Sequence, residues 1–261
     1  MKSFTSSYFW AGFIVVAIVP MIWFYVYGAF FYMIDFHTSE EFKYKYKVQN
    51  NIRITFDQFI DAFNISFRNW VVLGLPYLFM VCKYNEYLYE KNGKREPVLP
   101  TVGILLRDLV VYVILEEVMF YFSHRALHWN SFYASIHKFH HKFTAPCAIA
   151  AVYAHPIEHM LSNVIPVAAG PMLMASHPIS AMIWGILALF NTMTVHSGYD
   201  FSSLIIFPLP YFHDWHHEKF NENFGATGFL DNLLHTNKNY LETIAKGEMY
   251  APRKKYANKA N

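Results

Sequence analysis

Three short clusters hold eight of the fourteen histidines in this chain of 261 residues. The first cluster reads SHRALH, the second IHKFHHKF and the third FHDWHHEKF. Spacings of three and four residues place side chains on one face of a helix, with Cβ atoms roughly 5–6 Å apart. One helix can therefore offer two or three imidazoles to the same metal centre. The clustered residues are His124, His128, His137, His140, His141, His213, His216 and His217.

The histidine count indicates two metal ions rather than one. Neutral imidazole suits iron, zinc, copper and nickel. A single structural zinc ion needs four ligands, and this chain offers twice that number. The two cysteines, Cys82 and Cys147, lie far apart in apolar sequence, which argues against a disulfide framework and against a cysteine-based zinc site. We therefore expect nitrogen and oxygen ligands.

The composition is that of a membrane protein. Hydrophobic residues make up 54% of the chain and charged residues only 15%, well below the roughly 25% usual for soluble proteins. The formal net charge is only +2, and no basic run interleaved with aromatic residues spans a plausible groove. Nucleic acid is therefore excluded as a partner.

Apolar stretches predict an all-α integral membrane protein. Residues 3–34 carry no charged side chain, which is more than the roughly 20 residues that cross a hydrocarbon core. Further passes are expected at about 63–82 and 105–122. The uncharged stretch 159–199 is broken by AGPMLMASHPIS and predicts a helical hairpin, 157–175 and 179–195. In total we expect about four to five membrane-embedded helices.

The hairpin brings the histidine clusters to one membrane face. A segment that enters and leaves the membrane returns to its starting side, so the clusters before and after the hairpin share that side. Basic residues follow in the C-terminal tail, and positive residues favour the cytoplasm. We therefore expect a cytosolic, histidine-rich helical cap, with residues 1–35 as a membrane anchor and 36–261 as the catalytic domain.

The ordered motifs SHRALH, IHKFHHKFTAP, YAHPIE, HSGYDF and HDWHHEKFNENFG resemble those of the sterol desaturase and fatty acid hydroxylase superfamily of membrane diiron enzymes. Within it, HKFHHKFTAP, YAHPIE and HSGYD are most similar to the 4-methylsterol monooxygenase branch. The resemblance runs from KYKVQ to GFLDNLLHT, which is most of the chain. Two features differ from that branch: Trp129 stands where a further histidine is frequent, and LLHTNKN replaces LHGTD.

The resemblance implies an enzyme that uses two iron ions and O2 to oxidise the 4-methyl group of a sterol. The eight clustered histidines match the three histidine boxes, and His196 matches a further histidine of the family. It also implies residence in the endoplasmic reticulum membrane and electrons from NAD(P)H through cytochrome b5 or a reductase. No glycine-rich dinucleotide motif is present in the sequence, so the electron donor is a separate partner.

Several other residues are weaker candidates. Glu117 shares a helical stripe with His124 and could orient a ligating imidazole through its second ring nitrogen, although a structural pairing fits equally well. Asp214 and Asp200 are similar candidates. His155 is a candidate for an extra metal ligand. His177 is expected at the turn of the hairpin.

Three alternative functions remain open. The HPIEH motif matches the H-x-x-E-H arrangement of inverted zinc peptidases, but that interpretation leaves the histidine boxes unused. A fatty acyl or sphingolipid hydroxylase would use the same chemistry on another lipid. A metal-binding scaffold without turnover would retain the boxes but form no product.

Overall fold

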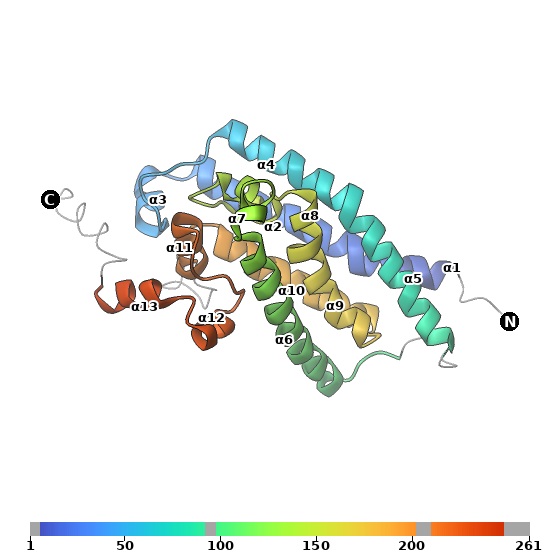
Figure 1. Cartoon of the computed structure of the whole chain (residues 1–261). Coiled ribbons are helices and arrows are strands. Elements are labelled where there is room, and N and C mark those ends of the chain that lie inside the picture. Colours follow the sequence, from blue (N-terminus) through green and yellow to red (C-terminus); the bar gives the residue numbers. More distant parts are fainter. Residues whose placement is uncertain (1–5, 92–97, 202–209, 248–261) are drawn as a thin grey trace.

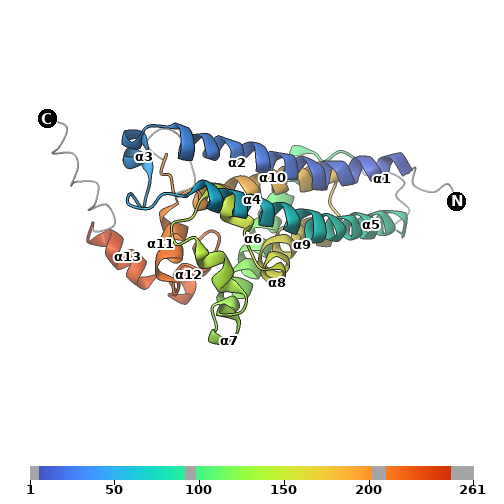
Figure 2. The same cartoon turned by 90° about the horizontal axis from the view of Figure 1, so that it is seen from above.

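The computed structural model describes residues 6–91, 98–201 and 210–247, and it is built from helices. Within these residues the single β-bridge joins Lys47 to Tyr199. The all-α prediction is thus confirmed. Figures 1 and 2 show long helices side by side, with short helices gathered at the end far from the N-terminus.

Two long helical rods form one side of the bundle (Figure 2). The first rod comprises α1 (Ser6–Phe13), η1 (Ile14–Ile18) and α2 (Val19–His37). The second comprises α4 (Phe56–Asn69), η2 (Trp70–Gly74) and α5 (Leu75–Lys91). Both are long and apolar enough to cross a membrane, which agrees with the first two predicted passes. Each rod contains a π-helical turn, and η1 directly precedes Pro20.

The predicted hairpin is present. Its first arm runs through α8 (Pro156–Glu158), η5 (His159–Val164) and α9 (Ile165–Leu173), and its second arm is α10 (Pro178–His196). His177 Nδ1 accepts a hydrogen bond from the Ile179 N–H at the start of α10. The prediction that His177 is a turn residue is therefore correct.

Helix α6 (Val102–Leu127) confirms the third predicted helix, but it is not one of the three segments that qualify as membrane spans by length and composition. Its charged residues include Asp108, Glu116 and Glu117. One face packs along α9, while the opposite face is exposed and apolar. That exposed face comprises Leu106, Val110, Ile114, Val118 and Phe122. This i, i+4 spacing places the apolar side chains in one stripe, which suits contact with lipid.

The short elements gather toward one end of the bundle (Figure 1), and two of them, η3 and α11, carry six of the clustered histidines. They are α3 (Glu40–Tyr46), α7 (Asn130–Tyr133), η3 (His137–Lys142), η4 (Ala148–Val152), α11 (Tyr211–Lys219), α12 (Phe229–Leu234) and α13 (Lys238–Ala245). Element η4 is fully buried, and its backbone accepts hydrogen bonds from the second rod. Ser66 Oγ donates to Ile149 O at 3.1 Å and Asn69 Nδ2 to Val152 O at 3.4 Å. Asn69 Nδ2 also donates to Ala154 O, two residues after η4, at 2.9 Å. The core of the bundle thus fixes the segment that follows the second histidine cluster.

A close contact between α6 and α9 at Gly170 provides a test of this packing. A Cβ atom at Gly170 would clash with the Tyr112 ring and would lie 3.0 Å from Tyr112 Cα. We expect Gly170→Ala to lower stability by about 1–3 kcal/mol, because overpacking forces backbone shifts. The readout is thermal unfolding of the full chain in detergent.

Gly103→Ala is the matched control, since Gly103 is also helical but a Cβ there meets nothing within 4 Å. This change should leave the unfolding temperature unchanged or raise it slightly, because alanine favours helix. Equal unfolding temperatures for the two variants would contradict the α6–α9 packing.

Candidate metal centre

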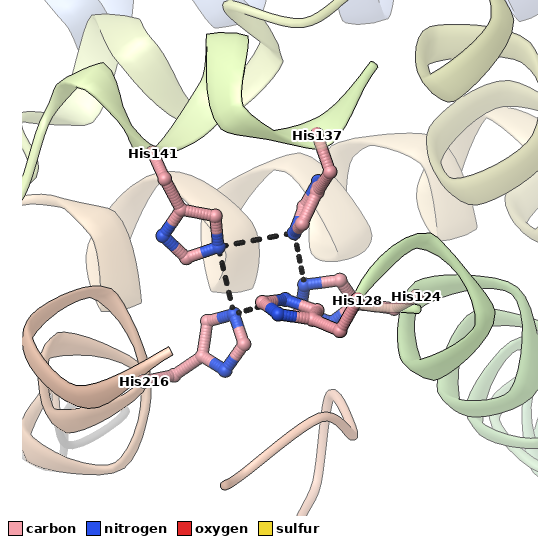
Figure 3. Close-up of side chains that lie close together, drawn as sticks. All are labelled: His124, His128, His137, His141 and His216. Carbon is pink, nitrogen blue, oxygen red and sulfur yellow. Dashed lines mark hydrogen bonds between the residues drawn. The ribbon is translucent and has the colours of Figure 1, made fainter. Parts of the chain in front are cut away.

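Nine histidines form two adjacent groups of candidate ligand atoms. Within each group the atoms lie within 4.8 Å of one another. The first group is His124, His128, His137, His141 and His216. The second group is His140, His196, His213 and His217. Figure 3 shows the first group, whose imidazoles point toward one another from α6, η3 and α11.

Each HxxHH cluster is divided between the two groups. His137 and His141, four residues apart, belong to the first group, while His140 belongs to the second. The third cluster is divided in the opposite sense, because His213 and His217 belong to the second group and His216 to the first. The sequence analysis noted that one helix can offer two or three imidazoles to the same metal centre, and the pairs four residues apart do so. In addition, η3 and α11 each contribute to both groups, and they cross-link the two groups.

The ring tautomers favour cation binding. His124 Nδ1 donates to Phe224 O at 2.7 Å, and His137 Nδ1 donates to Glu158 Oε1 at 2.8 Å. A backbone carbonyl carries no proton, so His124 keeps an Nε2 lone pair, and this atom lies only 3.1 Å from the His137 Nε2 atom. Two facing lone pairs repel unless a cation lies between them.

The second group has the same arrangement. His140 Nδ1 donates to Tyr153 O at 3.0 Å and His196 Nδ1 to Thr192 O at 2.7 Å, while their Nε2 atoms are 3.4 Å apart. Imidazole nitrogens about 2.0–2.1 Å from one ion lie roughly 2.9–3.4 Å apart at angles of 90–109°. Neighbouring Nε2 atoms within the two groups lie between 2.9 and 3.4 Å apart. The side chains therefore fit a metal ion in each group.

Burial keeps these imidazoles neutral. It lowers the pKa of His140 to about 4, and it lowers the pKa of His216 and His217 well below the usual value, with neighbouring imidazoles adding to the effect. A lowered histidine pKa means that the neutral form persists at pH 7. Neutral imidazole is the form that binds metal.

Glu158 is a functional residue that the sequence analysis missed. It was considered only as part of the peptidase motif, but its carboxylate accepts the His137 Nδ1 proton inside the protein. A carboxylate behind a ligating histidine fixes the ring and raises its basicity. The peptidase interpretation finds no support, because His155, Glu158 and His159 do not form a metal-binding group among the described residues. The feature of the sequence that could have identified Glu158 is its position at the end of the motif YAHPIE.

The carboxylates proposed to orient imidazoles do not contact them. Glu117 accepts hydrogen bonds from the backbone N–H groups of Ala226, Thr227 and Leu230, at 2.8–3.1 Å. It therefore holds the loop before α12 rather than a histidine. The prediction that Glu117 orients an imidazole is therefore corrected. Glu117 shares a helical stripe with His124, but a distant loop supplies the N–H donors that Glu117 binds.

Asp214 and His155 also have other partners. Asp214 Oδ1 accepts from Gln49 Nε2 at 2.8 Å, and Asp200 accepts from the Tyr211 hydroxyl at 2.6 Å. His155 lies outside both histidine groups, and its Nδ1 accepts from the Ile157 N–H at the start of α8. Among the described residues, the structure thus brings nine of the ten candidate metal ligands together and places His155 apart.

A cavity of about 710 Å³ reaches the second histidine group from the membrane-embedded helices. His196 and His213 line one end, and Val16, Pro20 and Trp184 are among the apolar residues along its length. The three π-helical turns η1, η2 and η5 all contribute to its wall. A cavity of this size accommodates a drug-sized or lipid molecule.

Comparison with known proteins gives consistent matches. The fatty acid hydroxylase family model matches residues 109–236, which contain all three histidine clusters. Fatty acid hydroxylase domain-containing protein 2 of Homo sapiens is 36% identical over 90% of this chain and 70% of its own length. Methylsterol monooxygenase erg25B of Aspergillus fumigatus is 32% identical over 73% of this chain and 67% of its own.

Fatty acid hydroxylase ahd1 of Mycosarcoma maydis is 37% identical over 56% of this chain and 39% of its own. No solved structure matches the chain significantly.

The division of the clusters predicts which variants lose which ion. Replacing both His213 and His217 with alanine should remove about half of the bound metal, and so should replacing both His137 and His141, because each pair supplies a different group. Elemental analysis of detergent-purified protein measures this loss. The control replaces His155 and His177, which lie outside both groups, and should keep the full content. Complete loss of metal in both pair variants would argue against two separable sites.

A second prediction concerns Glu158. Glu158→Ala leaves the His137 N–H without an acceptor, and we expect metal affinity to fall about 10–100-fold. Glu158→Gln retains an acceptor oxygen and should keep more of the affinity. Competition with a graded series of chelators measures the change. Unaltered affinity in Glu158→Ala would contradict a supporting role for this carboxylate.

Proposed function

Because the chain belongs to the fatty acid hydroxylase family, we propose that it is a membrane-bound diiron monooxygenase that hydroxylates an unactivated C–H bond of a lipid. The observation that carries this proposal is the apolar cavity that ends at His196 and His213. Two groups of neutral imidazoles supply nitrogen ligands suited to iron. The nine histidines of the two groups are the proposed ligands, and Glu158 is the proposed support for His137.

The side chains of the site have distinct tasks in this proposal. Bound iron supplies the redox chemistry with O2 that acid and base side chains lack. Backbone carbonyls of Phe224, Tyr153 and Thr192 hold the ring orientation of three proposed ligands. The apolar wall of the cavity binds the lipid body and excludes bulk water. The reacting carbon then lies beside His196 and His213, which are the proposed metal ligands that line the cavity.

The proposed substrate is a sterol whose 4-methyl group is oxidised. Two observations support it: the motifs HKFHHKFTAP, YAHPIE and HSGYD in the sequence, and the methylsterol monooxygenases among the relatives. We further propose that the enzyme resides in the endoplasmic reticulum with the histidine groups facing the cytosol. In that position a cytochrome b5 or a reductase can deliver electrons from NAD(P)H.

The test is oxygen-dependent turnover by the full chain in detergent or liposomes, with a reductase system and NAD(P)H. We expect a 4-hydroxymethyl or 4-carboxyl product from a 4-methylsterol, detected by mass spectrometry. His140→Ala combined with His216→Ala should abolish the product, because one ligand of each group is lost. Lack of product from every sterol, with full metal content, would overturn the sterol assignment.

A fatty acyl hydroxylase is the second candidate, and the fatty acid hydroxylase of Mycosarcoma maydis among the relatives favours it. The same assay with ceramides and fatty acids distinguishes the two. A hydroxylated acyl product in place of a sterol product would support this candidate. If no lipid is converted although metal is bound, the scaffold hypothesis gains support instead.

A further inference from the structure

The cavity contains polar side chains that have no partner in the protein. Glu116, Asn163 and Asn191 line it, and none of them makes a hydrogen bond or ion pair within the described part of the chain. His159 also lines it, and both of its ring nitrogens are buried without a partner there. Ser162 differs, because its hydroxyl donates to Ser123 Oγ at 3.1 Å.

Unpartnered polar groups in an apolar cavity call for an explanation. Leaving a buried donor or acceptor unsatisfied costs about 1–3 kcal/mol, and native proteins pair the great majority of such groups. Glu116, Asn163 and Asn191 are half-buried and line one apolar cavity without a partner, which indicates that a ligand provides partners for them. Because they come from three different elements, α6, η5 and α10, they surround the cavity rather than line one edge.

The position of Asn191 along the cavity follows from its place in α10. Asn191 precedes His196 by five residues, so it lies roughly 7.5 Å from the histidine along the helix axis at 1.5 Å per residue. The cavity continues along α10 past Trp184 to Ala181, roughly 22 Å from His196. Asn191 thus lies near the metal end, and the residues of α10 that line the path beyond it, from Leu189 to Ala181, are apolar. A ligand that fits has one polar group close to its reacting end and a long apolar body.

The polar side chains that line the cavity determine which polar group of a ligand can bind there. The two asparagine amides can donate and accept, whereas an ionised Glu116 can only accept. No lysine or arginine lines the cavity among the described residues, and Glu116 would repel an anion. A carboxylate therefore finds no counter-charge, whereas a hydroxyl group, which both donates and accepts, finds partners for both roles.

We propose that Glu116, Asn163 and Asn191, supported by His159, form a hydroxyl-binding site that selects a neutral hydroxylated lipid over a free fatty acid and over a hydrocarbon of the same shape. This inference rests on the proposed function, because it takes the cavity to be the substrate site. It assigns specificity to residues outside the histidine boxes. Asn163 and Asn191 act as positioning residues, since they fix the polar group and thereby the carbon that reaches the metal end.

The experiment measures ligand preference without turnover. Radiolabelled 5α-cholestan-3β-ol is bound to the full chain in detergent, and it is displaced by unlabelled 5α-cholestan-3β-ol, 5α-cholestane or stearic acid. Cholestane differs from the sterol only in lacking the hydroxyl group. We expect the sterol to compete at least about tenfold better than cholestane, as the loss of one or two hydrogen bonds predicts. Stearic acid should compete poorly.

Variants test the residues themselves. Asn163→Leu combined with Asn191→Leu should reduce the preference for sterol over cholestane to near one, because the isosteric side chains keep the shape but not the hydrogen bonds. Glu116→Gln should keep sterol binding and improve competition by stearic acid, because the negative charge is removed. Asn85→Leu is the matched control, since Asn85 lines an adjoining second cavity and not the one that reaches the histidines, and this change should leave the preference unchanged.

The outcomes distinguish this inference from the proposed function. Equal competition by sterol and cholestane in the wild type, or a preference that survives in the double leucine variant, overturns the hydroxyl-binding site even if the enzyme turns over. If the double leucine variant loses the preference for sterol over cholestane and the Asn85→Leu control keeps it, the hydroxyl-binding site is supported even if no product forms. If the leucine variant fails to fold, Asn163→Ser with Asn191→Ser keeps hydrogen-bonding groups, and it must retain a preference for the sterol.

Discussion

The main constraint on this structure is the close approach of neutral imidazoles, whose Nε2 lone pairs face each other at about 3 Å and repel each other. His140 and His196 illustrate it, since the carbonyls of Tyr153 and Thr192 accept both Nδ1 protons and leave the Nε2 atoms opposed at 3.4 Å. Such an arrangement is unfavourable on its own and favourable around a cation. The short helices, the carbonyl acceptors and the buried Glu158 all act to hold the rings in this position.

The membrane-embedded helices serve this arrangement in two ways. The hairpin of α8 to α10 returns the chain to the end where it began, so His196 and α11 meet η3 there. The same helices enclose the cavity that leads to His196 and His213. The candidate metal centre and the cavity are therefore formed by the same packed helices. The π-helical turns that line the cavity belong to helices that also support the site.

The acidic residues show how little helical spacing says about a partner. Glu117 and His124 share a face of α6, yet Glu117 binds the backbone of residues 226–230. Glu158 lies 21 residues from His137 and contacts it directly. A carboxylate in an apolar interior binds whichever donors the fold brings near, and N–H groups at the start of a helix compete well with an imidazole. The sequence analysis therefore identified buried carboxylates near the site, but it named Glu117 rather than Glu158 as the residue that could orient an imidazole.

The sequence by itself determined the all-α membrane fold, the hairpin and eight of the converging histidines, because hydropathy and i, i+3, i+4 spacing act locally along the chain. The ninth, His196, was a candidate only through the resemblance to the family. Only the tertiary structure decided how those histidines divide into two groups. His140 and His141 are neighbours in sequence but belong to different groups: His140 Nδ1 donates to the distant Tyr153 O, whereas His141 Nδ1 has no hydrogen-bond partner among the described residues and its Nε2 lies near His137 and His216. The unpartnered polar groups of the cavity also emerged only in three dimensions, because a polar residue in an apolar helix can equally be paired or free until its neighbours are known.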